Sequence, residues 1–257
     1  MIISLIIAYF FLSGGHETFL LNPNMAKNVS YYVKDKARKD KIDKIIKAVG
    51  KNQEVFEKKT KNVYDKKLVE LNLDPSSKIT AFTAEYDSFY TGLKILQESY
   101  IDSELVIKSL IKPNEWDSIM AKVLMTPTKD KVKKQISKQN QDLYSRLLKA
   151  SNKAISNAAD QQKAKIYLKE YTAKGDTLSA GFLDLNYKYI KDIRPYSATK
   201  SDFEQAGIKM IQLRRNYTDY LVVMRFKLIA ITPKDKWQDL AKELNSSFTY
   251  MGAGLSK

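Results

Sequence analysis

A run of apolar residues at heptad spacing, from Ser77 to Lys112, constrains the fold more than any other part of the chain. Its apolar positions recur with alternating steps of three and four residues, and the polar Ser103 occupies one of them. This spacing places one apolar stripe along a helix of about five heptads, which is typical of long helices that pack lengthwise against others. The stripe consists of Ile79, Phe82, Tyr86, Phe89, Leu93, Leu96, Tyr100, Ile107 and Leu110.

A second long helix is predicted before this one, from about Met25 to Leu71. The sequence Asp74-Pro75-Ser76-Ser77 ends it and supplies an N-cap for the next helix, so the two are expected to form an antiparallel hairpin. A short helix from Trp116 to Leu124 follows Pro113. The apolar stripe of the helix predicted from Met25 to Leu71 consists of Ile42, Ile45, Val49, Phe56 and Val63, and it then shifts to Tyr64, Leu68 and Leu71.

The second half of the chain repeats this order of elements. A basic segment from Lys129 to about Ala173 precedes a predicted turn at Lys174-Gly175-Asp176-Thr177. A returning helix is expected from Leu178 to about Ile193, before Pro195. Another starts near Thr199 or Ser201 and ends near Ile231, with the stripe Phe203, Ala206, Met210, Leu213, Tyr217, Tyr220 and Met224.

The two tryptophans of the chain suggest an internal duplication. Trp116 and Trp237 each follow a proline that ends a long helix, and each precedes an Ala-Lys-x-Leu sequence. We therefore predict an all-α protein of two long antiparallel helical hairpins, each ending in a short helix, in an elongated, coiled-coil-like four-helix-type bundle. The predicted units are a signal peptide or anchor at 1–24, repeats at 25–125 and 126–250, and a flexible tail at 251–257.

The net charge of +15 is concentrated in two parts of the chain. From Lys27 to Lys67, 14 Lys and Arg stand against 6 Asp and Glu, and from Lys129 to Lys174 the numbers are 12 and 4. Each of these two basic segments carries +8, and the remaining residues carry −1. Such segregation favours contact with an anionic membrane surface, an acidic polysaccharide or an acidic protein, although charge runs also simply solvate a helix face.

The first twelve residues form an uncharged apolar run that is shorter than a membrane-spanning helix requires. Its length matches the core of a signal peptide, and Ser13 and Gly15 are suitable for cleavage before His16. We expect an exported protein, periplasmic or secreted, or one anchored by residues 1–22. A true start at Met25 and a buried N-terminal helix are the alternatives.

The residue inventory argues against catalysis. The chain has no cysteine, so a thiol nucleophile is excluded. Its one histidine, His16, lies in the N-terminal segment, so a Ser-His-Asp triad has no credible base and a multi-histidine metal site is excluded. No phosphate-binding glycine loop or zinc-protease motif occurs. Acidic pairs at helical spacing, such as Glu98 and Asp102, are interpreted as ordinary ion-pair partners. We predict no catalytic, cofactor or metal site.

These observations favour a non-enzymatic, envelope-associated scaffold or adaptor whose lysine-rich helices contact an anionic surface or partner. Two alternatives remain open. One is a sensor with a ligand pocket between helices, lined by Tyr86, Tyr100 and Tyr217. The other, which the apolar N-terminal run disfavours, is a cytoplasmic nucleic-acid-binding protein. The apolar stripes are also compatible with a homo-oligomer.

Overall fold

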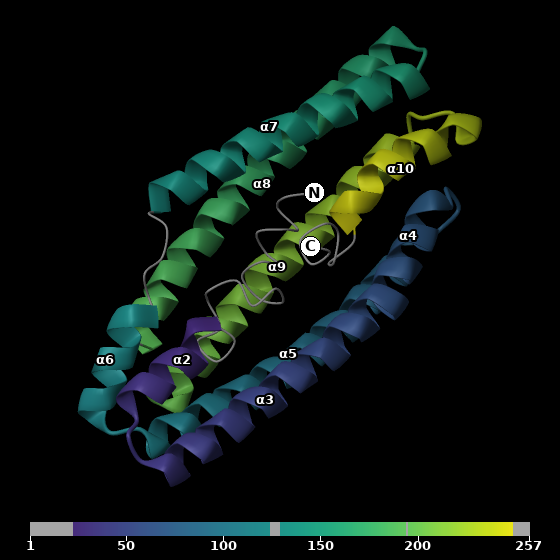
Figure 1. Ribbon diagram of the computed structural model, residues 1–257. Coiled ribbons are helices and arrows are strands. Elements are labelled where there is room, and N and C mark those ends of the chain that lie inside the picture. The colour runs from purple at the N-terminus through teal and green to yellow at the C-terminus, as the bar shows by residue number, and fades with distance from the viewer. Residues whose placement is uncertain (1–22, 124–128, 194, 249–257) are drawn as a thin grey trace.

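The computed structural model describes residues 23–123, 129–193 and 195–248, and every regular element within these ranges is helical (Figure 1). The predicted all-α fold class is confirmed. Residues 1–22 and 249–257 lie outside the described ranges, so the predictions of a signal peptide or anchor and of a flexible tail concern residues that the structure does not describe.

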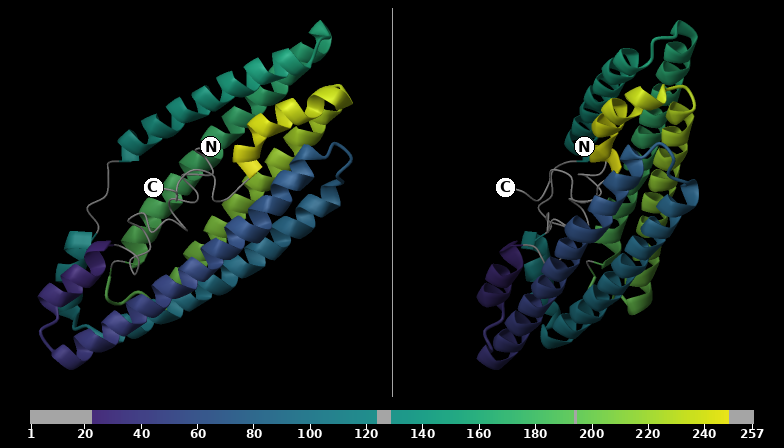
Figure 2. Two further views of the ribbon diagram at one scale, coloured as in Figure 1. Left: turned by 45° about the vertical axis from the view of Figure 1, so that its right-hand side comes forward. Right: turned by 90° about the vertical axis from the view of Figure 1, so that its right-hand side faces the viewer.

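Five long helices form one row in which each packs on the next (Figures 1 and 2). Apolar residues at helical spacing form a common core along this row, and most of the stripe on α5 is buried. Along the row, the helices are α3 (Lys36–Lys59), α5 (Ile79–Leu110), α9 (Lys200–Ile229), α8 (Ala158–Ile193) and α7 (Lys129–Ala154).

Shorter helices cover the two ends of the row. At one end, α10 (Trp237–Phe248) packs against both α4 (Asp65–Leu73) and α7, so it connects the two outer edges of the row (Figure 2). The 3-10 turn η3 (Lys234–Lys236) leads into it. At the other end, α2 (Pro23–Tyr32) packs against α6 (Pro113–Val123). Trp116 and Trp237 are both buried, as a hydrophobic role requires.

The single helix predicted from residue 25 to 71 is wrong, because the chain breaks after Tyr32. Asp35 caps a new helix there by accepting a hydrogen bond of 2.8 Å from the backbone N of Arg38. A π-helical turn, η2 (Thr60–Tyr64), then precedes α4. The wider π turn moves the apolar stripe by one residue, so Val63 is 50% exposed and Tyr64 is buried. Placing Val63 in the stripe was therefore wrong.

Helix α5 agrees with its heptad pattern except at its start. Ile79 is 48% exposed, so its assignment to the apolar stripe is wrong. It is the first residue of α5. The following short helix α6 begins at Pro113, three residues before the predicted start, because proline is well suited to the first position of a helix.

The turn predicted at Lys174–Thr177 is also wrong, because these residues lie inside α8. The chain turns at residues 155–157 instead, where the Asn157 carboxamide oxygen caps α8 by accepting from the backbone N of Ala159 at 2.8 Å. Packing of α7 stabilises the helix at the predicted turn, since buried Asn140 donates to the Asp176 carboxylate. The second half keeps the three helices of the predicted ranges, but the first two meet at residues 155–157, and the row contains five long helices where a four-helix-type bundle was expected. The internal duplication remains a prediction, and the turn predicted at Lys174–Thr177 no longer supports it.

We expect Gly50→Ala to raise the free energy of unfolding by about 0.5–1 kcal/mol, because alanine removes backbone freedom from the unfolded chain. Gly50 lies inside α3, and a Cβ atom there would meet no other atom within 4 Å. Urea denaturation measures the change. Gly207→Ala is the matched comparison, since its Cβ would overlap the Gln97 side chain and should offset the gain. An unchanged or lower stability of Gly50→Ala would contradict the expectation.

Candidate functional site

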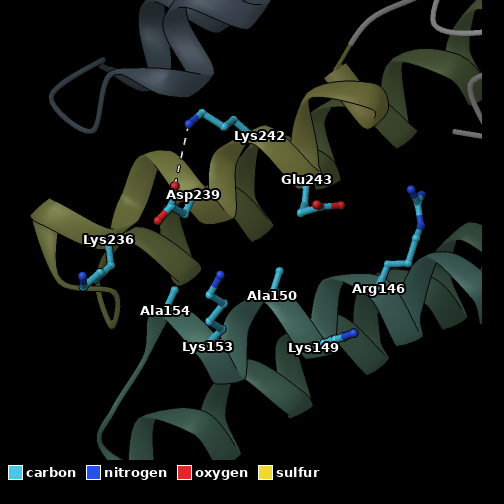
Figure 3. Close-up of a pocket in the computed structure, with 9 residues that line it drawn as sticks. All are labelled: Arg146, Lys149, Ala150, Lys153, Ala154, Lys236, Asp239, Lys242 and Glu243. Carbon is cyan, nitrogen blue, oxygen red and sulfur yellow. Dashed lines mark ion pairs between the residues drawn. The ribbon is translucent and has the colours of Figure 1, made fainter.

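An open groove of about 580 Å³ lies between α7 and the η3–α10 segment at the end of the bundle (Figure 3). Five of its lining residues are cationic and two are carboxylates, which gives the lining a net positive charge. The lining residues are Arg146, Lys149, Ala150, Lys153 and Ala154 from α7, and Lys236, Asp239, Lys242 and Glu243 from η3 and α10.

Helical spacing places the α7 residues on one wall. Arg146, Lys149 and Lys153 follow at steps of three and four, so they share one face of the helix. Leu143 and Leu147 lie on another face and are buried in the core, which fixes the rotation of α7. The small side chains of Ala150 and Ala154 leave space between the cations, and this space forms the floor of the groove.

The opposite wall is the polar face of α10. This helix buries Trp237, Leu240, Ala241 and Leu244 against the bundle. Its remaining face carries Asp239, Lys242 and Glu243, and the Asp239 carboxylate lies 3.7 Å from the Lys242 ammonium in an exposed ion pair. The strong division into an apolar and a polar face explains how so short a helix is held in place.

Buried hydrogen bonds from α4 fix the position of α10. The Asn72 amide donates to the backbone oxygen of Ala241 and to the Asn245 side-chain oxygen, both at 2.8 Å. The Trp237 indole donates to the backbone oxygen of Asn72 at 2.9 Å. Since Asn72 is fully buried, these bonds are shielded from water and hold α10 firmly against α4.

The cations of the α7 wall are available to a ligand. Within the part of the chain that the structure describes, Arg146, Lys149 and Lys153 form no ion pair with a carboxylate. Figure 3 shows Arg146 and Lys153 pointing toward α10, while Lys149 runs along α7. An arrangement of this kind can bind anions by charge-assisted hydrogen bonds.

The residues that the sequence singled out lie elsewhere. Asp102 pairs with Lys200 at 2.7 Å and Glu98 with Lys94 at 3.9 Å, both as exposed ion pairs. No cluster of residues able to hold a metal ion occurs in the described ranges. His16 lies outside them.

The seam tyrosines lie in the core and do not line the groove. Tyr86, Tyr100 and Tyr217 are each at most 9% exposed. The Tyr100 hydroxyl donates to the Gln53 carboxamide oxygen at 3.1 Å, and burial raises the pKa of Tyr100. Tyr217 is hydrogen-bonded to Tyr171 on α8. The hydroxyls of Tyr100 and Tyr217 thus interact with other buried residues.

The two basic segments do not form one surface. The first covers α2, α3, η2 and the start of α4, and the second covers α7 and the first half of α8. These parts lie on opposite edges of the row (Figure 1). Sequence reasoning identified the basic character of α7 but missed α10 as its partner, because their proximity depends on how α10 packs against α4.

Comparisons with protein-family models, curated proteins and solved structures give no match to this chain. Among the described residues, no helix combines the length and the apolar character that crossing a membrane requires.

Proposed function

We propose that this protein is a non-enzymatic, envelope-associated helical scaffold that binds an anionic partner through the groove between α7 and α10. The observation that carries this proposal is the α7 wall, on which three cations share one helix face and have no carboxylate partner among the described residues. Lysines whose only role is to solvate a helix need not line a groove between two helices. The apolar run at residues 1–12 is the basis for export or membrane attachment.

Binding agrees better with the residue inventory than catalysis does. The chain has no cysteine and one histidine, and the groove is lined by Lys, Arg, Ala, Asp and Glu. Because the lining contains no aromatic ring, it lacks the stacking platform on which proteins bind single-stranded nucleic acids. A nucleic-acid function is therefore the weaker proposal. The buried positions of Tyr86, Tyr100 and Tyr217 likewise give little support to a sensor pocket between the helices.

Neutralising the α7 wall should abolish most of the anion binding. We expect the triple variant Arg146→Gln, Lys149→Gln, Lys153→Gln to bind inorganic tripolyphosphate at least about 10-fold more weakly, because each lost charge-assisted hydrogen bond contributes about 1.5–3 kcal/mol when fully formed. Isothermal titration calorimetry at low and moderate salt measures the affinity. Higher salt should weaken binding by the wild-type protein, since exposed charges are screened.

A matched control comes from the other basic segment. Lys44, Lys47 and Lys51 on α3 have the same spacing along a helix, are exposed and form no ion pair among the described residues. Changing all three to Gln removes the same charge far from the groove. We expect a loss of less than about 3-fold, from long-range electrostatics alone. Equal losses in the two variants would show that net charge, and not the groove, is responsible.

A further inference from the structure

Both carboxylates that line the groove belong to α10, whereas the charged residues of the α7 wall are all cations. Arg146 and Lys153 point from the α7 wall toward α10, and the carboxylates Asp239 and Glu243 belong to the α10 wall (Figure 3). No ion pair closes the groove by joining these two walls within the described part of the chain. A ligand between them therefore meets only cations among the charged groups of the α7 wall, and finds the carboxylate acceptors, together with Lys236 and Lys242, on the opposite wall.

This separation restricts the chemistry of the ligand. A simple anion would gain from Arg146 and Lys153 but would be repelled by Asp239 and Glu243. A ligand that also carries a hydrogen-bond donor satisfies the carboxylates and avoids part of this repulsion. The donor is expected to be a neutral hydroxyl and not an ammonium group, because Lys149, Lys236 and Lys242 also line the groove and would repel a second cation.

The spacing of the cations indicates more than one anionic group. Arg146 and Lys153 are seven residues apart, which corresponds to about 10 Å along a helix that rises 1.5 Å per residue. Two phosphoryl groups joined by a short linker can each contact one of these cations, and the linker then lies over Ala150, where no large side chain intervenes.

We infer that the groove binds a polyol carrying two phosphoryl groups, with the phosphoryl groups on the α7 wall and a hydroxyl of the polyol donating to Asp239 or Glu243. This inference rests on the proposed anion-binding function and adds the ligand class to it. The same chemistry occurs in a free polyol bisphosphate and in the headgroup of diphosphatidylglycerol, a lipid in which glycerol joins two phosphates.

Two matched ligands isolate the contribution of the hydroxyl. Glycerol 1,3-bisphosphate and propane-1,3-diol bisphosphate carry the same charges and differ in one hydroxyl group. We expect calorimetry to show that the wild-type chain binds the glycerol compound at least about 5-fold more tightly than the propanediol compound, because the hydroxyl adds a hydrogen bond to a carboxylate. In the variant Asp239→Ala, Glu243→Ala the ratio should fall below about 2, while the affinity for the propanediol compound should rise because repulsion is removed.

The outcomes distinguish this inference from the proposed function. Equal wild-type affinities for the two bisphosphates, together with equal binding of the two lipids in the vesicle comparison below, overturn the polyol inference. The proposed function still stands if the triple α7 variant loses binding of both bisphosphates. If that variant binds both ligands as tightly as wild type, the proposed function fails as well. A ratio unchanged by Asp239→Ala, Glu243→Ala also overturns the inference, because the hydroxyl would then be recognised elsewhere.

Vesicles identify the source of the ligand. Co-flotation with vesicles containing diphosphatidylglycerol or its 2′-deoxy analogue repeats the comparison on a membrane. Preference for the hydroxylated lipid assigns the groove to a lipid headgroup. If the protein prefers the hydroxylated compound only among the soluble bisphosphates, the ligand is a free polyol bisphosphate. If neither assay shows a preference for the hydroxylated compound, the inference is overturned.

Discussion

Replacing Arg225 with methionine is expected to lower the free energy of unfolding by about 3–5 kcal/mol, because a buried hydrogen-bonded charge would be lost and its acceptors would remain without donors. The Arg225 guanidinium on α9 is fully buried, and its Nη2 donates to the backbone oxygens of Leu71 at 2.8 Å and Asp74 at 2.7 Å. Its Nε donates to the Asn72 side-chain oxygen at 3.2 Å. These acceptors end α4, whose last carbonyls lack partners within the helix.

The surroundings of Arg225 explain why few substitutions should be tolerated. Its guanidinium lies 4.6 Å from the ring centre of Phe82 and 5.4 Å from that of Trp237. Burial lowers the pKa of Arg225 to about 10, which still leaves it charged at neutral pH. Because Asn72 also holds α10, the loss of Arg225 should loosen the α10 wall of the groove as well as the contact between α4 and α9.

Urea unfolding of Arg225→Met and Arg225→Lys tests this expectation. Lysine keeps the charge but lacks the planar fork that reaches several acceptors, so it should recover only part of the stability. Near-ultraviolet circular dichroism should show a changed environment of Trp237 in both variants. A loss below about 1 kcal/mol for methionine would mean that the carbonyls of α4 find other donors without strain.

Replacing Glu104 with glutamine is expected to make the protein more stable at neutral pH, by about 3 kcal/mol at pH 7 if the whole titration effect is recovered. Glu104 lies on α5 and is 5% exposed, and its Oε1 has no hydrogen-bond partner in the described ranges. Burial raises the pKa of Glu104 from its ordinary 4.5 to about 8, and the nearby Lys108 ammonium opposes this shift. The carboxyl is thus mainly protonated at neutral pH.

The sign of the pH dependence follows from these two pKa values. Above pH 4.5 the unfolded chain releases the Glu104 proton, whereas the folded protein keeps it until about pH 8. Stability is therefore fully present below pH 4.5 and is lost progressively as the pH rises to about 8. Glutamine stays neutral in both states and avoids this loss, so the difference between the two proteins should grow with pH.

Unfolding curves between pH 4 and pH 8 measure this difference. Glu98→Gln on the same helix is the control, because Glu98 is exposed in its ion pair with Lys94 and its replacement should change stability by less than about 0.5 kcal/mol at any pH. Lys108 must stay intact in all variants, since its ammonium donates to the backbone oxygen of Ala198 at 2.6 Å and lies 5.6 Å from the ring centre of Trp116. Parallel curves for wild type and Glu104→Gln would contradict the prediction.

Local sequence patterns predicted the long helices well where one face of a helix decides its burial. The stripe from Phe82 to Ile107 became the core face of α5 because heptad spacing alone determines which side chains share a face. The Thr199–Asp202 capping box likewise starts α9 close to the predicted position, through contacts between residues three apart. Both features depend on residues that are neighbours along the chain.

Breaks within helices were harder to predict, because turn-forming residues act together with tertiary packing. Gly175 and Asp176 indicated a turn, yet the packing of α7 keeps them helical, with Asp176 accepting from Asn140. The actual turn at residues 155–157 contains neither glycine nor proline. At Val63 the sequence showed the shift of the stripe, and the structure identified its cause as a π turn.

The amino-acid sequence by itself determined the all-α class, the apolar stripe of α5 and the concentration of positive charge in two segments, since these follow from composition and spacing. Only the tertiary structure placed α10 beside α7, which creates the groove, and only it buried Arg225 and Glu104. These features require contacts between residues more than 80 positions apart, such as Asn72 with Ala241. Local periodicity carries no information about such contacts, because it specifies which face of a helix is buried but not which helix covers it.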